Sequence, residues 1–168
     1  GKTTLLNVLC GFIRPDAGEV LFGGRRYQVR PHQLASLGVA RTLQGVGLYS
    51  GLTALENVMV GATCRASAGF WSALLALPRA GRDERMLRGL AEQALERVGA
   101  ADVAGARPTE LPYGMRKKVA LARALAAKPG LILLDEPASG LSESELNDLG
   151  DLIRDLASEG SLMVVEHH

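Results

Sequence analysis

The sequence predicts an α/β fold with a mostly parallel sheet and an inserted α-helical subdomain. Residues 131–134 are four consecutive aliphatic residues, which are too few for a helix and lack the alternation of a half-exposed strand. Such a run is typical of a parallel strand with helices on both faces, and residues 162–165 form a second one. From residue 53 to about residue 98 the pattern becomes helical. We therefore expect residues 1–52 and 111–168 to form the α/β core and residues 53–110 the helical subdomain.

Length and composition indicate a globular domain with a hydrophobic core of its own. The chain has 168 residues, of which 47% are hydrophobic and 22% charged. A formal net charge of only +1 gives no general electrostatic reason to bind nucleic acid. Cys10 and Cys64 are far apart and predict buried, unpaired thiols rather than a disulfide or zinc site. Because the chain opens on Gly1 rather than on Met, we expect it to be truncated at its N-terminus.

Two acids follow the first aliphatic run directly. Asp135 and Glu136 come at its carboxyl end, and Pro137 then ends the strand because it lacks a backbone donor. Open α/β sheets bind their ligands at this edge. Adjacent acids can divide the work there, one holding a metal and the other polarising a water. The alternative is a strand that ends in two solvated acids before a turn.

The first residues combine a phosphate-binding pattern with a helix start. Gly1, Lys2, Thr3 and Thr4 precede apolar residues at helical spacing, and G-K-[ST] is the closing half of a P-loop. In that loop, backbone N–H groups and the helix N-terminus hold phosphate. Lys would reach the β- and γ-phosphates and the first Thr would bind Mg²⁺. The alternative is an ordinary helix start capped by Thr.

The next segments are short until the helical region begins. We expect a helix ending near Gly11, a strand at residues 19–22, a short helix at 32–37 and a strand at 39–44 ending in Gln44. Thr53 and Glu56 fit a capping box, and residues 83–98 form an amphipathic helix. The apolar residues 70–77 either pack beneath the helical region or form a docking surface.

The last third of the chain alternates helix and strand. Pro112 is well placed at a helix start, and the basic residues that follow indicate either a solvated helix face or a nucleic-acid patch. Ser142 and Glu145 fit a second capping box. The helix after it has a predicted buried stripe of Leu146, Leu149, Ile153 and Leu156 and ends near Gly160. The strand at 162–165 then carries Glu166 and His167 at its carboxyl end.

The order of these motifs resembles that of the ATP-binding cassette ATPases. The chain matches the family's motifs in order: Gly-Lys-Thr-Thr, Gln44 after a strand, a helical region, Leu-Pro-Tyr-Gly at a helix start, Leu-Leu-Asp-Glu-Pro and Glu-His. In the family these are the Walker A, Q-loop, signature, Walker B and H-loop, with the D-loop between the last two. Residues 40–44, 52–61 and 111–114 look like the subunits that energise branched-chain amino acid importers. The resemblance implies a P-loop NTPase core that binds ATP and Mg²⁺.

The resemblance also implies a role for each matching residue. Thr3, Gln44 and Asp135 would hold the metal, and Glu136 would orient and deprotonate the attacking water. His167 would contact the γ-phosphate, and Gln44 would link the metal and the water to the membrane-facing helical region. Phosphate would be bound by Gly1, Lys2, Thr3 and Thr4. The residues that would close over ATP bound by a second copy of the chain are Leu111, Pro112, Tyr113, Gly114 and Met115.

The implied partners are a second nucleotide-binding subunit in a head-to-tail dimer, transmembrane permease subunits and, indirectly, a periplasmic or extracellular solute-binding protein. The subunit would lie peripherally on the cytoplasmic face of the membrane and bind no nucleic acid. The signature departs from L-S-G-G-Q, because Pro112 has no N–H to donate and Met115 replaces the usual Gln. An ABC ATPase for another substrate, a non-transport cassette protein and an inactive binding module are the alternatives.

Overall fold

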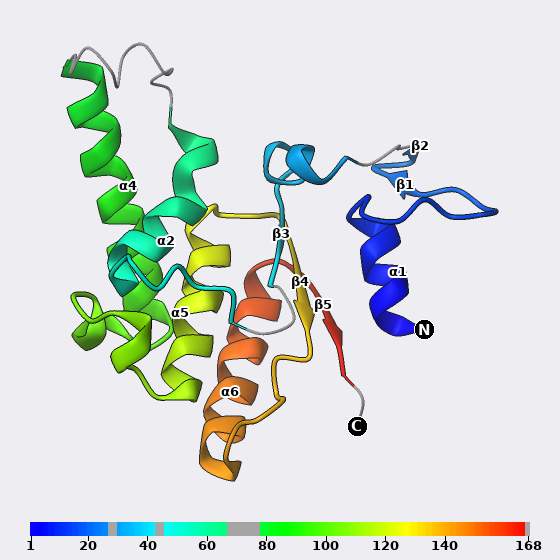
Figure 1. Ribbon diagram of the computed structural model, residues 1–168. Coiled ribbons are helices and arrows are strands. Elements are labelled where there is room, and N and C mark those ends of the chain that lie inside the picture. The colour runs from blue at the N-terminus through cyan, green and yellow to red at the C-terminus, as the bar shows by residue number, and fades with distance from the viewer. Residues whose placement is uncertain (27–29, 43–45, 67–77, 167–168) are drawn as a thin grey trace.

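The fold is a small parallel sheet with helices on both faces, joined to a group of packed helices (Figure 1). The computed structural model describes residues 1–26, 30–42, 46–66 and 78–166. Its described part confirms the predicted α/β class and the mainly parallel pairing. The apolar residues 70–77 lie outside the described residues.

Three parallel strands form the sheet, in the order β3 (Val39–Arg41), β4 (Leu131–Asp135) and β5 (Ser161–Val165). Arg41 is in register with Leu133, and Asp135 with Val165, so the strands end near one another. The predicted strand at 19–22 is shorter than expected. It is reduced to β1 (Leu21–Phe22), which pairs antiparallel with β2 (Arg25–Arg26) outside the main sheet.

Helices cover the two faces of the sheet unequally. On one face α1 (Lys2–Leu9) buries Leu6 and Cys10 against Val39 and Leu133, with Leu34 and Leu37 packed beside them. On the other face lie α5 (Tyr113–Ala126) and α6 (Glu143–Glu159), which cover Ile132 and Leu134 (Figure 1). Alternate residues of β4 therefore point to opposite cores, which explains why its sequence is continuously apolar.

The helical region packs around α5. Helices α2 (Ala54–Ala62) and α4 (Pro78–Arg97) bury Val58 and Leu95 in the same core as Val119 of α5. This core is continuous with the one on the α5 face of the sheet, so the division at residues 53 and 110 stays a prediction. Single-turn 3₁₀ helices connect the longer elements: η1 (Pro31–Gln33), η2 (Ala35–Leu37), η3 (Thr63–Arg65), η4 (Ala101–Val103) and η5 (Pro108–Glu110).

Both predicted capping boxes are confirmed. Thr53 Oγ1 accepts from the Glu56 backbone N–H at 3.2 Å, and Glu56 Oε2 accepts from the Thr53 N–H at 2.8 Å. Ser142 and Glu145 make the same reciprocal pair at the start of α6. These contacts satisfy N–H groups that a helix start otherwise leaves unpaired, which fixes where α2 and α6 begin.

Three smaller expectations were wrong, the first being that residues 162–165 form a strand covered on both faces: Met163 and Val164 of β5 are 38% and 39% exposed. Cys10 is buried as predicted, but Cys64 is exposed because η3 carries it out of the core. Leu146 is 39% exposed, so the buried stripe of α6 rests on Leu156 with Leu149 and Ile153 half-buried.

In the described part of the chain, no helix combines the length and apolar character that crossing a membrane requires.

Gly61 sets how closely α2 approaches α5. A Cβ at Gly61 would lie 2.0 Å from the Arg123 carbonyl oxygen, whereas a Cβ at Gly89 in α4 meets nothing within 4 Å. We expect Gly61→Ala to destabilise the protein by about 1–3 kcal/mol, because the helices must separate. Gly89→Ala should be neutral or stabilising by up to about 1 kcal/mol. Urea denaturation of both variants measures this; equal stabilities would show that the contact is not tight.

Candidate functional site

The carboxyl ends of the three strands bring the predicted strand-end acids to one edge of the sheet. Asp135 is the last residue of β4, and Glu136 follows it with its N–H donated to the Val165 carbonyl at 2.9 Å. Glu166 comes directly after β5, on the neighbouring strand. Asp135 is buried and Glu136 half-buried, at the edge where open α/β sheets bind ligands.

Asp135 is held by a buried ion pair. Arg41 Nη2 lies 2.9 Å from Asp135 Oδ2, with the two side chains only 8% and 0% exposed. The same guanidinium donates through Nη1 to Asn7 Oδ1 of α1 at 2.7 Å. Among the residues that the structure describes, the buried Asp135 Oδ1 has no hydrogen-bond partner. One carboxylate oxygen is therefore fixed by Arg41, while the other is an unused acceptor within the described part of the chain.

The predicted phosphate-binding lysine lies near this edge. Lys2 Nζ donates to the Glu166 carbonyl at 2.5 Å, which places its ammonium at the carboxyl end of β5. Lys2 and Thr4 are exposed, and Thr3 is half-buried at the first turn of α1. A helix start with an ammonium beside it suits an anionic ligand such as phosphate.

Glu136 adopts an unusual backbone conformation. Its φ is 49°, in the left-handed region that costs a residue with a side chain roughly 1–2 kcal/mol. Such strain persists only where the surroundings impose it, and it is frequent at functional sites. The turn after Glu136 is tied to β5, since the Ala138 N–H donates to Glu166 Oε1 at 2.8 Å.

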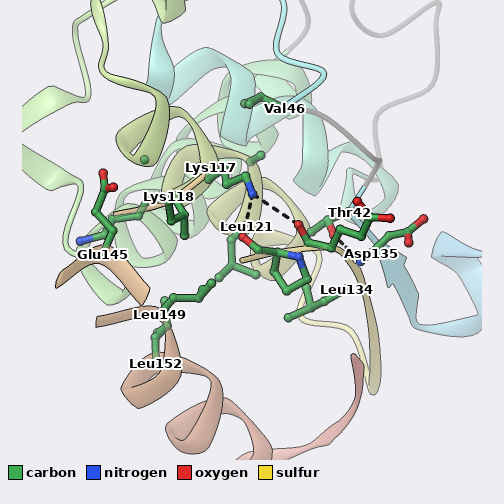
Figure 2. Close-up of a pocket in the computed structure, with 15 residues that line it drawn as sticks. Thr42, Val46, Lys117, Lys118, Leu121, Leu134, Asp135, Glu145, Leu149 and Leu152 are labelled. Carbon is green, nitrogen blue, oxygen red and sulfur yellow. Dashed lines mark hydrogen bonds between the residues drawn. The ribbon is translucent and has the colours of Figure 1, made fainter. Parts of the chain in front are cut away.

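A pocket on the α5 side of the sheet reaches the same turn (Figure 2). Lys117 lies in its centre and donates to the carbonyls of Glu136 at 3.3 Å, of Pro137 at 2.8 Å and of Ser139. Burial lowers the pKa of Lys117, and the carboxylates of Glu166 and Glu136 oppose that shift. The predicted solvated face of α5 is therefore wrong at this position.

The residues that resemble a signature lie apart from Lys2. They surround the start of α5, across the sheet from α1 (Figure 1). Leu111 and Gly114 are buried, while Pro112 and Tyr113 are exposed and Met115 is half-buried. A Cβ at Gly114 would lie 1.8 Å from Glu145 Oε1, so a larger residue there would have to displace the Glu145 side chain. Within this single chain, residues 111–115 and Lys2 therefore belong to helices on opposite faces of the sheet.

Sequence reasoning missed two residues that the structure brings to the site. Arg41 carries the ion pair with Asp135, and Lys117 carries the contacts to the turn after Glu136. The signal for Arg41 was a charged residue within a predicted strand of a buried sheet. Lys117 had no signal, because it stands among three other cations on one helix. Gln44 and His167 fall outside the described residues, so their roles stay predictions.

These features define a class of protein. A parallel α/β sheet with a Gly-Lys-Thr helix start and an Asp-Glu pair at a strand end is the arrangement of a P-loop nucleoside triphosphatase.

Comparison with known proteins gives the family. The model of the ABC transporter family matches residues 1–139. The chain is 36% identical over 170 residues to the high-affinity branched-chain amino acid transport ATP-binding protein BraF of Pseudomonas aeruginosa, covering 99% of this chain and 67% of BraF. It is 34% identical over 181 residues to the octopine permease ATP-binding protein P of Rhizobium radiobacter. That match covers 100% of this chain and 64% of the relative.

A solved structure agrees with this result. The dimeric, post-hydrolysis structure of the ATP-binding cassette MJ0796 bound to ADP and Pi matches with a TM-score of 0.79 at 26% identity. The match covers 100% of this chain and 70% of that one. The chain belongs to the ABC transporter family and is an ATPase of that family. It spans about two thirds of the length of these relatives.

The buried ion pair gives a prediction for stability. Arg41→Met leaves Asp135 as an uncompensated buried charge and should cost about 3–5 kcal/mol of unfolding free energy. The matched control is Arg154→Met, whose ion pair with Asp151 is 75% and 73% exposed and should contribute almost nothing. Urea denaturation measures both. Equal, small losses would mean that Asp135 is not held by Arg41.

Proposed function

We propose that this protein is the nucleotide-binding subunit that hydrolyses ATP to power an ABC importer of branched-chain amino acids. The observation that carries the catalytic part is the convergence of Asp135, Glu136 and the Lys2 ammonium at one sheet edge. The similarity to BraF and the Leu-Pro-Tyr-Gly sequence at residues 111–114 support the amino acid class.

The residues at this edge fit a magnesium ion. Mg²⁺ usually binds proteins through one or two carboxylates or hydroxyls and keeps several waters. Asp135 offers a buried oxygen without a partner among the described residues, and the half-buried Thr3 supplies a hydroxyl at the start of α1. Asp135, Thr3 and Gln44 would hold the ion, which when bound neutralises charge on the β- and γ-phosphates.

The residues of the chain then divide the work of hydrolysis. Lys2, with the amides of Gly1, Thr3 and Thr4, binds the phosphates and stabilises their charge. Glu136 accepts a proton from the water that attacks the γ-phosphorus, while the bond to the β-phosphate oxygen breaks and ADP leaves with inorganic phosphate. Gln44 orients the water, and His167 contacts the γ-phosphate.

Catalysis requires a second copy. Residues 111–115 lie at the start of α5 on one face of the sheet, whereas Lys2 begins α1 on the other face, so they bind ATP held by a partner in a head-to-tail dimer. The dimeric cassette structure among the similar proteins supports this arrangement. We place the dimer against permease subunits on the cytoplasmic face of the membrane, with a solute-binding protein on the other side.

A second candidate is an importer for opines or other amino acids. It is favoured by the 34% identity to the octopine permease ATP-binding protein. Because the permease and its solute-binding protein select the substrate, the two candidates are distinguished by uptake of labelled leucine or labelled octopine in cells that express the complete transporter.

Glu136→Gln tests the hydrolytic role. In the full-length subunit this variant should lose at least about 100-fold in steady-state hydrolysis, since the amide accepts no proton. It should also trap an ATP-bound dimer, visible by size-exclusion chromatography. The control Glu84→Gln changes an exposed glutamate of α4 and should leave the rate unchanged. Hydrolysis at the wild-type rate in Glu136→Gln would exclude Glu136 as the general base.

A further inference from the structure

Lys117 occupies an unusual position for a lysine. Its ammonium lies against three backbone carbonyls of one turn, those of Glu136, Pro137 and Ser139. A lysine ammonium has three N–H donors, so this set satisfies all of them. The side chain is half-buried and its Nζ lies 5.2 Å from the centre of the Tyr113 ring, which also faces the turn. Several contacts therefore fix the position of the Lys117 ammonium against this turn.

The turn that Lys117 holds is strained and carries the proposed general base. Glu136 has a φ of 49°, and three carbonyls converge where their dipoles repel one another. A cation placed at that point compensates the repulsion and stabilises the turn in this conformation. The backbone of Glu136 thus depends on a side chain that comes from α5.

Independent contacts pack the same turn against the start of α5. A Cβ at Gly140 would lie 2.9 Å from Tyr113 Cε1, so Tyr113 rests directly on the end of the turn. From the other side, Glu166 Oε1 accepts the Ala138 N–H at 2.8 Å. The turn is held between α5 and β5, and Lys117 is its charged contact with α5.

We propose that Lys117 is a positioning residue that sets the backbone of Glu136 and joins it to the start of α5. The inference rests on the proposed role of Glu136 and extends it. Lys117 lies two residues after Met115 on the same helix, so a displacement of residues 111–115 by a partner's nucleotide reaches Glu136 through one side chain. The two halves of the proposed dimeric site are thereby linked within each subunit.

Lys117→Met in the full-length protein tests this role. The turn should relax and move the Glu136 carboxylate by about an ångström, which lowers kcat on the order of 10- to 100-fold. The KM for ATP should change less than about twofold, because the three hydrogen bonds of Lys117 go to the turn after Asp135 and not to Lys2, Thr3 or Thr4. Lys117→Arg, which keeps the charge and the donors, should recover part of kcat. The control Lys128→Met removes an exposed lysine just beyond the other end of α5 and should keep wild-type kinetics.

Hydrogen–deuterium exchange gives a readout that does not depend on activity. In Lys117→Met the amides of Glu136 and of residues 138–141 should exchange at least about tenfold faster, while those of α5 keep their protection. General loss of protection would indicate a merely structural role and overturn the proposal. So would wild-type kcat and exchange in Lys117→Met. If Glu136→Gln retains turnover, the proposed function fails, whereas the exchange result still reports whether Lys117 holds the turn.

Discussion

The structure depends first on the buried contact between Arg41 and Asp135. A carboxylate with no exposed surface is tolerated only beside a compensating charge, and Arg41 supplies it at 2.9 Å. Because the guanidinium also binds Asn7, this one side chain joins β3, β4 and α1. Any displacement of these elements would leave an unpaired buried charge, so the phosphate-binding helix start and the strand-end acids are held in one arrangement.

The parallel register extends this arrangement to the neighbouring strand. Since β4 and β5 end together, Glu136 and Glu166 follow in adjacent positions, and the ammonium of Lys2 reaches the end of β5. The sheet thus supplies a rigid edge, whereas the strained turn after Glu136 is stabilised from outside by Lys117. We infer that the rigid edge binds nucleotide and metal, and that the turn is the part through which α5 influences hydrolysis.

Local patterns predicted much of this fold and part of the site. The apolar run of β4, the acids at its end and both capping boxes depend on near neighbours in sequence, and each was found where expected. Arg41 and Lys117 could not be assigned, because their partners lie 94 and 20 residues away and only the folded chain brings them together. Cys64 and Leu146 were placed in the core by composition and spacing alone, but the ends of their helices leave them at the surface.

The central claim is that Asp135 helps to hold a divalent cation beside bound ATP. Mn²⁺ can replace Mg²⁺ as a paramagnetic probe, so electron paramagnetic resonance measures the affinity directly in the full-length protein with ATP. We expect Asp135→Asn to weaken Mn²⁺ binding about 10- to 100-fold. Metal-free ATP binding should change less than about twofold, in a variant whose circular dichroism shows it to be folded. Equal Mn²⁺ affinity in the wild type and in Asp135→Asn would contradict the account.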